Sequence, residues 1–229
     1  MLEDLRKQVL EANLELVRRG LVLYTFGNAS GISRAEGLVA IKPSGVPYEG
    51  MRPEDLVITD LDGRIVEGTL RPSSDLATHL VLYRAFAGIG GVVHTHSRYA
   101  TSWAQARRPI PCLGTTHADY FRGPVPVTPA MSPQEIEAAY EANTGEVIAR
   151  HFAGGDAMQV PAVLVAGHGP FCWGPTAAEA AHNAVILEYV ARMAYRTLTL
   201  KAEAEGVSQA LLDRHYFRKH GPGASYGQG

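Results

Sequence analysis

Two histidines stand two residues apart at the end of a short apolar segment. The stretch GGVVHTHSR, residues 90–98, contains His94 and His96. Side chains at positions i and i+2 of a strand point to the same face, so a strand here presents both imidazoles to one point. Neutral imidazole nitrogens bind divalent metals such as zinc. The pair also fits two partly buried histidines that hydrogen-bond to the backbone, and it does not decide between these interpretations.

Two further groups suit the same metal. His168 lies in VLVAGHGPF, at the end of an apolar segment and between glycines that allow a tight, accessible turn. Asp75 ends the stretch RPSSD at the start of an expected helix, where a carboxylate either caps the helix or binds a cation. His168 alone could equally be a loop histidine without a ligand. Three histidines and one carboxylate fit Zn²⁺, with Mn²⁺ or Co²⁺ as alternatives.

Three short stretches rich in glycine and serine could bind a phosphate group. They are GNAS (27–30), KPSG (42–45) and PSSD (72–75). Backbone N–H groups and hydroxyls in such loops bind phosphate, and a lysine adds a positive charge. Ordinary turns use the same residue types, so each stretch is weak evidence by itself. The candidate contacts are Gly27, Asn28, Lys42, Ser44, Gly45, Ser73 and Ser74.

Two candidates for proton transfer come from elsewhere in the chain. Asp119 lies in TTHADY and Tyr226 in the C-terminal tail, and both a carboxylate and a phenol can transfer protons. Taken by themselves, the two residues fit a turn residue and part of a chain end better than a catalytic pair. The segment before the tail is basic, and it is either a solvated face or a phosphate contact: it contains His215, Arg218, Lys219 and His220.

The composition excludes several classes of function. The chain has 229 residues, 46% of them hydrophobic and 19% charged, which is typical of a globular protein. A net charge of -2 gives no case for nucleic acid or an anionic membrane as a partner. Cys112 and Cys172 have no metal-binding spacing and favour a reducing compartment. Without a signal peptide or an apolar span, we predict a cytoplasmic protein.

The elements expected from the pattern are mixed rather than regularly alternating. Helices are predicted near 2–19, 76–86, 97–106, 131–142, 176–198 and 208–220, and strands near 38–42, 91–96 and 162–166, with a hairpin over 56–68 and a turn-rich loop over 25–33. No glycine-rich nucleotide fingerprint joins a strand to a helix. We therefore predict a single α/β domain over residues 1–229, with three layers (α/β/α) and a central, largely antiparallel sheet.

Eight motifs in order along the chain resemble the L-ribulose-5-phosphate 4-epimerase family of the class II aldolase/epimerase superfamily. They are GNASGIS, IKPSGVPYEGM, VEGTLRPSSDLATH, GIGGVVHTHSRYATSWAQA, GTTHADYF, VLVAGHGPFCWG, LLDRHYFRKHG and SYGQ. The resemblance implies zinc bound by Asp75, His94, His96 and His168, substrate contacts from the three loops and from His215 and Arg218, and an acid/base pair of Asp119 and Tyr226. It also implies a homotetramer with active sites at subunit interfaces, each closed by a neighbour's tail.

The implied chemistry explains why a metal is needed. Carbon 4 of a ketose 5-phosphate is not adjacent to the C2 carbonyl, so its proton is not activated. Breaking and re-forming the C3–C4 bond inverts this carbon, and a divalent metal stabilises the three-carbon fragment as a Lewis acid. The resemblance implies a role in carbohydrate metabolism, in arabinose catabolism or another pentose or ascorbate route.

Two alternatives remain open at this point. One is a class II sugar-phosphate aldolase of the L-fuculose-phosphate type, in which a glutamate stands at the position of Asp75 and acts as the base. The other is a non-catalytic scaffold like the adducin head domain. The presence of all four ligand candidates and both acid/base candidates argues against the scaffold.

Overall fold

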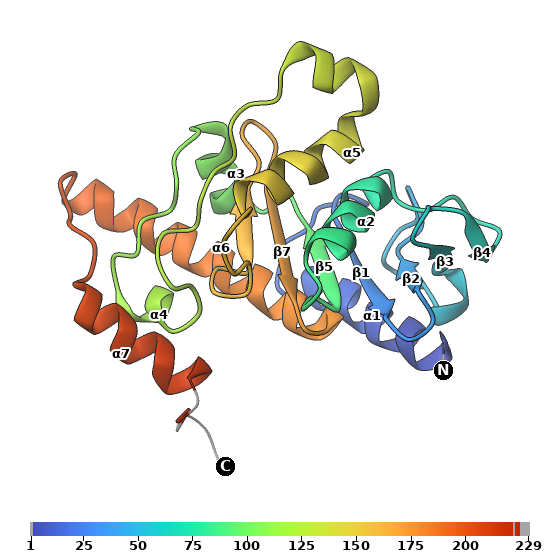
Figure 1. Ribbon diagram of the computed structural model, residues 1–229, viewed down its shortest axis with the longest axis horizontal. Helices are drawn as coiled ribbons and strands as arrows, with labels where there is room; N and C mark the ends of the chain where they lie inside the picture. The colour runs from blue at the N-terminus through green and yellow to red at the C-terminus, as the bar shows by residue number, and fades with distance from the viewer. Residues whose placement is uncertain (1, 222, 225–229) are drawn as a thin grey trace.

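The centre of the molecule is a seven-stranded antiparallel sheet between two groups of helices (Figure 1). The computed structural model describes residues 2–221 and 223–224. The strand order is β4-β3-β2-β1-β5-β7-β6. The strands are β1 (Asn28–Ser33), β2 (Leu38–Ile41), β3 (Val57–Asp60), β4 (Ile65–Glu67), β5 (Gly91–His94), β6 (Ala162–Leu164) and β7 (Pro170–Gly174).

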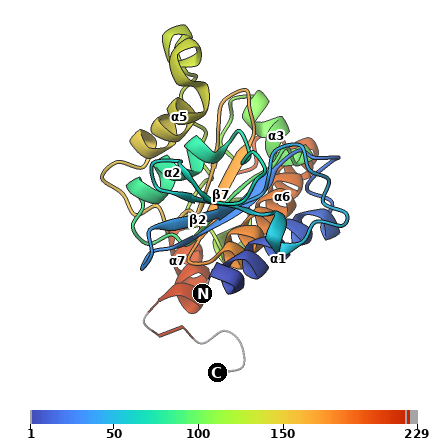
Figure 2. The same ribbon diagram turned by 90° about the vertical axis from the view of Figure 1, so that its right-hand side faces the viewer.

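Helices cover both faces of this sheet. Figure 2 shows α2 and α5 on one side and α1 and α6 on the other. The helices are α1 (Leu2–Arg18), α2 (Leu76–Ala85), α3 (Arg98–Gln105), α4 (Thr115–Ala118), α5 (Pro133–His151), α6 (Ala177–Leu200) and α7 (Gln209–His220), with a 3-10 turn η1 (Pro53–Asp55). The predicted three-layer α/β/α fold with an antiparallel sheet is confirmed. No helix in the described part of the chain is long and apolar enough to cross a membrane.

The alternation of side chains along the strands fills two cores. Val93 of β5 packs in the core beneath α1 and α6, whereas the neighbouring Val92 packs in the core that includes residues of α2. On the face of the sheet that α6 covers, strand β5 and this helix approach each other unusually closely. A Cβ on Gly91 would lie 2.4 Å from Cα of Ala177, the first residue of α6. This contact holds the strand that ends at His94 directly against the longest helix.

The local signals for helix ends and turns are confirmed at several positions. Ser132 and Glu135 form the predicted capping box of α5, and the side chain of Thr176 accepts from the backbone N–H of Glu179 at the start of α6. Gly63 adopts a positive φ of 83° in the β3–β4 hairpin. These contacts involve residues close in sequence, which is why the sequence pattern suffices to predict them.

Two strands of the sheet, β1 and β7, were not predicted from the sequence. Residues 25–33 were expected to be a turn-rich loop, but 28–33 form β1, which pairs with both β2 and β5 at the centre of the sheet. The small residues of this strand allow helix α1 to approach, since a Cβ on Gly31 would lie 2.8 Å from Cγ2 of Val9. Strand β7 was also missed, although it separates β5 from β6. Tertiary packing overrides weak strand propensity in both segments.

Candidate metal centre and substrate pocket

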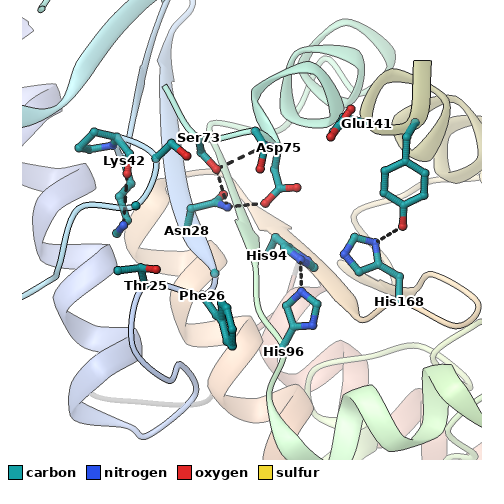
Figure 3. A pocket seen from close by; sticks show the side chains of 16 residues that line it. Thr25, Phe26, Asn28, Lys42, Ser73, Asp75, His94, His96, Glu141 and His168 are labelled. Carbon is teal, nitrogen blue, oxygen red and sulfur yellow. Dashed lines mark hydrogen bonds between the residues drawn. The ribbon is translucent and has the colours of Figure 1, made fainter. Parts of the chain in front are cut away.

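A cavity of about 400 Å³ opens where β1 and β5 meet the start of α2 and the middle of α5. Figure 3 shows the side chains that line it, with Lys42 on one side of Asn28 and the histidines on the other. The three predicted phosphate-binding stretches and the predicted metal ligands meet in this one cavity. The predicted residues that line it are Gly27, Asn28, Lys42, Ser44, Gly45, Ser73, Ser74, Asp75, His94, His96 and His168.

The three histidines come from two connected segments. His94 is the last residue of β5, His96 follows the strand, and His168 lies in the turn between β6 and β7. The expectation that both His94 and His96 lie on a strand is therefore wrong for His96. One potential ligand atom from each histidine lies within 4.8 Å of the other two. The two Nε2 atoms of His94 and His96 are 3.1 Å apart.

This histidine cluster fits a divalent metal. Nδ1 of His94 lies 3.0 Å from the carbonyl oxygen of Pro170 and must donate to it, which leaves the lone pair of Nε2 available. Two nitrogens bound to one Zn²⁺ at about 2.0–2.1 Å in tetrahedral geometry are about 3.3 Å apart, close to the observed separation of the two Nε2 atoms. Phe171 stacks on the His94 ring with 4.2 Å between centroids, so the ring is held on its face as well as at Nδ1.

The surroundings keep these imidazoles neutral. Burial lowers the pKa of His94 well below its ordinary value, and the nearby His168 and His96 lower it further. Burial likewise lowers the pKa of His168, with His96 as the next cause, and burial also lowers the pKa of His96. A metal binds only the neutral imidazole, so each of these changes favours a ligand role at neutral pH.

Asp75 does not act as a helix cap. It occupies the N-cap position of α2, but its side chain makes no capping hydrogen bond. Instead, Nδ2 of Asn28 donates to Oδ2 of Asp75 over 2.6 Å and to Oγ of Ser73 over 3.0 Å. Asn28 pairs with His94 across β1 and β5, so this bond ties the carboxylate to the strand that carries a histidine. Among the described residues, the cluster of ligand atoms within 4.8 Å comprises the three histidines and does not include Asp75.

Lys42 is a buried cation at the other end of the cavity. The residue is 1% exposed, and Nζ donates to the carbonyl oxygens of Val46 over 2.7 Å and Pro43 over 3.2 Å. Its ammonium lies 4.6 Å from the ring centroid of Tyr48. Burial lowers the pKa of Lys42 to about 8. The ordinary pKa of a lysine is 10.5, so burial makes the charged ammonium less favourable here. An anionic ligand bound beside Lys42 would offset that cost.

Backbone hydrogen bonds join two of the predicted phosphate loops. The N–H of Ser73 donates to the carbonyl oxygen of Lys42, and the N–H of Ser44 donates to that of Arg71. The stretches KPSG and PSSD, far apart in sequence, therefore form one continuous wall of the cavity. Turn signals alone could not establish this proximity.

Five residues that line the cavity were not predicted as contacts, and one of them, Pro43, lies within the KPSG stretch. Thr25 and Phe26 precede β1, and Tyr140 and Glu141 come from α5. The sequence reads as an uninterrupted helix through Tyr140, but Ala139 has φ -162° and ψ 75°, which breaks the helix at that point. Tyr140 directly follows this break, and its hydroxyl oxygen lies 3.3 Å from Nδ1 of His168. No sequence signal marks this kink, because neither proline nor glycine is present there.

Asp119 belongs to a second cluster at the other side of the molecule. Oδ1 and Oδ2 accept from Nε and Nη2 of Arg218 over 3.1 and 2.8 Å, and Nδ1 of His215 is 3.0 Å from Oδ1. Partial burial acts to raise the pKa of Asp119, but the hydrogen bonds from Arg218 and His215 outweigh it and lower the pKa below its ordinary value. The carboxylate is therefore ionised at neutral pH.

The two clusters are separate within one chain. Among residues 2–221 and 223–224, those lining the histidine cavity do not include Asp119, His215 or Arg218. Figure 1 shows α4 and α7, which carry the second cluster, at the left of the view and apart from α2 and β1. The predicted acid/base partner Tyr226 lies outside the described residues.

The chain is similar to known proteins both in sequence and in structure. The sequence pattern of the class II aldolase and adducin N-terminal domain matches residues 7–195. The chain is 51% identical over 227 residues to the L-ribulose-5-phosphate 4-epimerase UlaF of Salmonella paratyphi B, covering 99% of this chain and 100% of that protein. Among solved structures, an L-fuculose 1-phosphate aldolase has a TM-score of 0.79 at 26% identity, covering 95% of this chain and 96% of that one. The L-fuculose-1-phosphate aldolase of Thermus thermophilus has a TM-score of 0.69 at 25% identity, covering 89% and 98%.

Proposed function

Since this chain belongs to the class II aldolase and adducin N-terminal domain family, we propose that it is a metal-dependent L-ribulose-5-phosphate 4-epimerase, an isomerase that interconverts L-ribulose 5-phosphate and D-xylulose 5-phosphate. The observation that carries this proposal is the 51% identity to a 4-epimerase over 99% of the chain. The convergence of a histidine cluster and a lysine-containing loop pair in one cavity supports it, because metal-dependent chemistry on a sugar phosphate needs a metal site beside a phosphate site.

The reaction proceeds by cleavage and re-formation of the C3–C4 bond. A proton on C4 is not acidic, and this chain has no nicotinamide-binding fingerprint for an oxidation route. When the C4 hydroxyl loses its proton, the C3–C4 bond breaks and glycolaldehyde phosphate forms. The aldehyde turns to present its other face, the three-carbon fragment adds to it, and a proton returns to the new hydroxyl.

The histidine cluster is the proposed metal site. A divalent metal held by His94, His96 and His168, with Asp75 as the proposed fourth ligand, supplies Lewis-acid stabilisation of the negative charge that develops when the bond breaks. We propose Zn²⁺, with Mn²⁺ or Co²⁺ as substitutes, since neutral imidazole and carboxylate ligands suit all three.

The remaining cavity residues hold the phosphate and its aldehyde. Lys42 supplies the charge, and Asn28 lies between it and the histidines, beside Asp75. A held phosphate anchors the two-carbon fragment while its aldehyde rotates, which prevents its release as free product. The proposed contacts are Gly27, Asn28, Lys42, Ser44, Gly45, Ser73 and Ser74.

The acid/base pair comes from a neighbouring subunit in this proposal. Asp119 and Tyr226 transfer the protons on the two sides of the aldehyde. His215 and Arg218, which hold the Asp119 carboxylate, are the remaining proposed substrate contacts. A second chain is invoked because Asp119, His215 and Arg218 do not line the histidine cavity of their own chain. The proposed assembly is a homotetramer of single-domain subunits, in which each tail closes a neighbour's cavity and excludes water. We further propose a cytoplasmic enzyme of carbohydrate metabolism, in arabinose catabolism or in another pentose or ascorbate route.

The experiment that tests the proposal measures two products at once. Purified protein is loaded with Zn²⁺ or treated with a chelator, and each sample is incubated with L-ribulose 5-phosphate. Metal-dependent formation of D-xylulose 5-phosphate with little free glycolaldehyde phosphate is expected. Free glycolaldehyde phosphate without the epimer would identify an aldolase instead. If neither product forms, the result contradicts the proposed function.

A further inference from the structure

We propose that Tyr140 is a positioning residue for the metal site: its hydroxyl oxygen accepts a hydrogen bond from Nδ1–H of His168 and thereby directs Nε2 of that ring toward His94 and His96. The hydroxyl oxygen lies 3.3 Å from Nδ1. This inference rests on the proposed metal site, and it gives the His168 ring a hydrogen-bond partner on a helix that the sequence did not place near the cluster.

The direction of the hydrogen bond follows from the chemistry of imidazole. A neutral ring has one N–H and one lone pair, and the bond made at one nitrogen decides which of them the other nitrogen carries. With Nδ1 protonated and donating to Tyr140, the lone pair is on Nε2. The His168 ring centroid lies 4.6 Å from that of His94 and 5.1 Å from that of His96, and Tyr140 engages Nδ1, so Nε2 is the nitrogen left for the cluster.

His168 needs this support more than His94 does. His94 ends a strand, donates to the carbonyl oxygen of Pro170 and stacks on Phe171. His168 lies in a turn, and its ring meets Phe171 only edge-on, with 6.0 Å between centroids. A ring in a turn can rotate about its side-chain torsions, so a hydrogen bond at Nδ1 sets the orientation that the strand provides for His94.

Tyr140 is able to position a ligand because its own backbone is held. The Oγ1 atoms of Thr78 and Thr144 donate to the carbonyl oxygens of Glu141 and Tyr140, respectively. A Cβ on Gly145 would lie 2.6 Å from Cβ of Val81, so α5 packs directly against α2 just after the kink. The helix segment that carries Tyr140 is thereby fixed to α2.

The packing of α5 against α2 also connects the two sides of the metal site. Helix α2 begins immediately after Asp75, and α5 carries Tyr140, so both helices meet the cavity from one side. The histidines come from β5 and from the turn between β6 and β7 on the other side. The hydrogen bond between Tyr140 and His168 therefore links the helical layer to the histidine cluster across the cavity.

The test is the zinc affinity of Tyr140→Phe, measured by competition with a chromophoric chelator. Loss of an outer-shell partner typically weakens metal binding about 10–100-fold, and we expect a loss in that range. Tyr189→Phe, on the exposed face of α6, is the matched control and should bind zinc as the wild type does. The midpoint of thermal unfolding without metal should be the same for all three proteins, because the proposed role concerns the bound ring.

The outcomes separate this inference from the proposed function. If the wild type binds no zinc, the proposed function fails and the inference fails with it. If the wild type binds zinc and Tyr140→Phe binds it equally well, the inference alone is overturned. Two other results also overturn it: a lower unfolding midpoint of the metal-free variant, which indicates a structural role, or a raised KM at saturating zinc with unchanged zinc affinity, which indicates a substrate contact.

Discussion

Replacing Lys42 by methionine should stabilise the protein at neutral pH while weakening substrate binding. Lys42 is 1% exposed, and its hydrogen bonds go to two backbone carbonyls and not to a carboxylate. Methionine keeps most of the length and apolar volume of the side chain and removes the charge. The variant also removes the two hydrogen bonds from Nζ, so the pH-dependent part of the stability difference is what reports the cost of the buried cation.

The magnitude follows from the pKa. Burial lowers the pKa of Lys42 from its ordinary 10.5 to about 8, so between these values the unfolded chain binds a proton that the folded protein does not. Stability of the wild type therefore rises with pH across this window, and the full penalty is present below pH 8. At about 1.4 kcal/mol per pH unit, that penalty is about 3 kcal/mol at pH 7 and falls to about 1 kcal/mol at pH 10.

The assay is urea unfolding of wild type and Lys42→Met between pH 7 and pH 10, at one fixed protein concentration. The stability advantage of the variant should shrink by about 2 kcal/mol over this range. Lys201→Met changes an exposed lysine and should show a difference from wild type that does not vary with pH. A pH-independent difference for Lys42→Met would refute the reasoning, since it would mean that Lys42 titrates in the folded protein as it does in the unfolded chain.

Three further substitutions test the site. His96→Ala should lose zinc and nearly all activity while remaining folded, because the His96 side chain is exposed and belongs to the histidine cluster, not to the core. His151→Ala, which changes another exposed histidine, is the control. A His96→Ala variant that is active without metal would contradict the assignment. Asp75→Glu lengthens the carboxylate by one methylene and should increase release of free glycolaldehyde phosphate relative to epimerisation; an unchanged product ratio would argue against a role for this position in retaining the fragments. Tyr226→Phe should lower turnover about 100-fold or more with unchanged assembly size by gel filtration, and normal turnover would remove Tyr226 from the mechanism.

The types of the site residues could be predicted from the sequence because short-range patterns carry them. His94 and His96 lie in one short segment, His168 follows an apolar segment, and the glycine–serine stretches are recognisable as loops around Lys42. Capping residues predicted the starts of α5 and α6 for the same reason. Each of these signals is contained within a few residues, where local sterics and hydrogen bonding decide the conformation.

The errors have a common physical origin in contacts between distant segments. The segment 28–33 has weak strand propensity, and it becomes the central strand because its small residues fit beneath α1. The kink at Ala139 has no local signal, yet it brings Tyr140 to the cavity. His96 was expected within a strand that in fact ends at His94. In each case packing between elements, rather than intrinsic preference, selects the conformation.

The amino-acid sequence alone shows which chemistry is available: imidazoles for a metal, a lysine and hydroxyl-rich loops for a phosphate, and a carboxylate and a phenol for protons. Which of these groups share a site depends on the folded arrangement of the chain. It joined the loops at Lys42 and Ser73 into one wall, and it separated Asp119 from the histidine cavity within a chain. The physical reason is that side-chain chemistry belongs to individual residues, whereas proximity depends on how strands pair and helices pack across the whole chain.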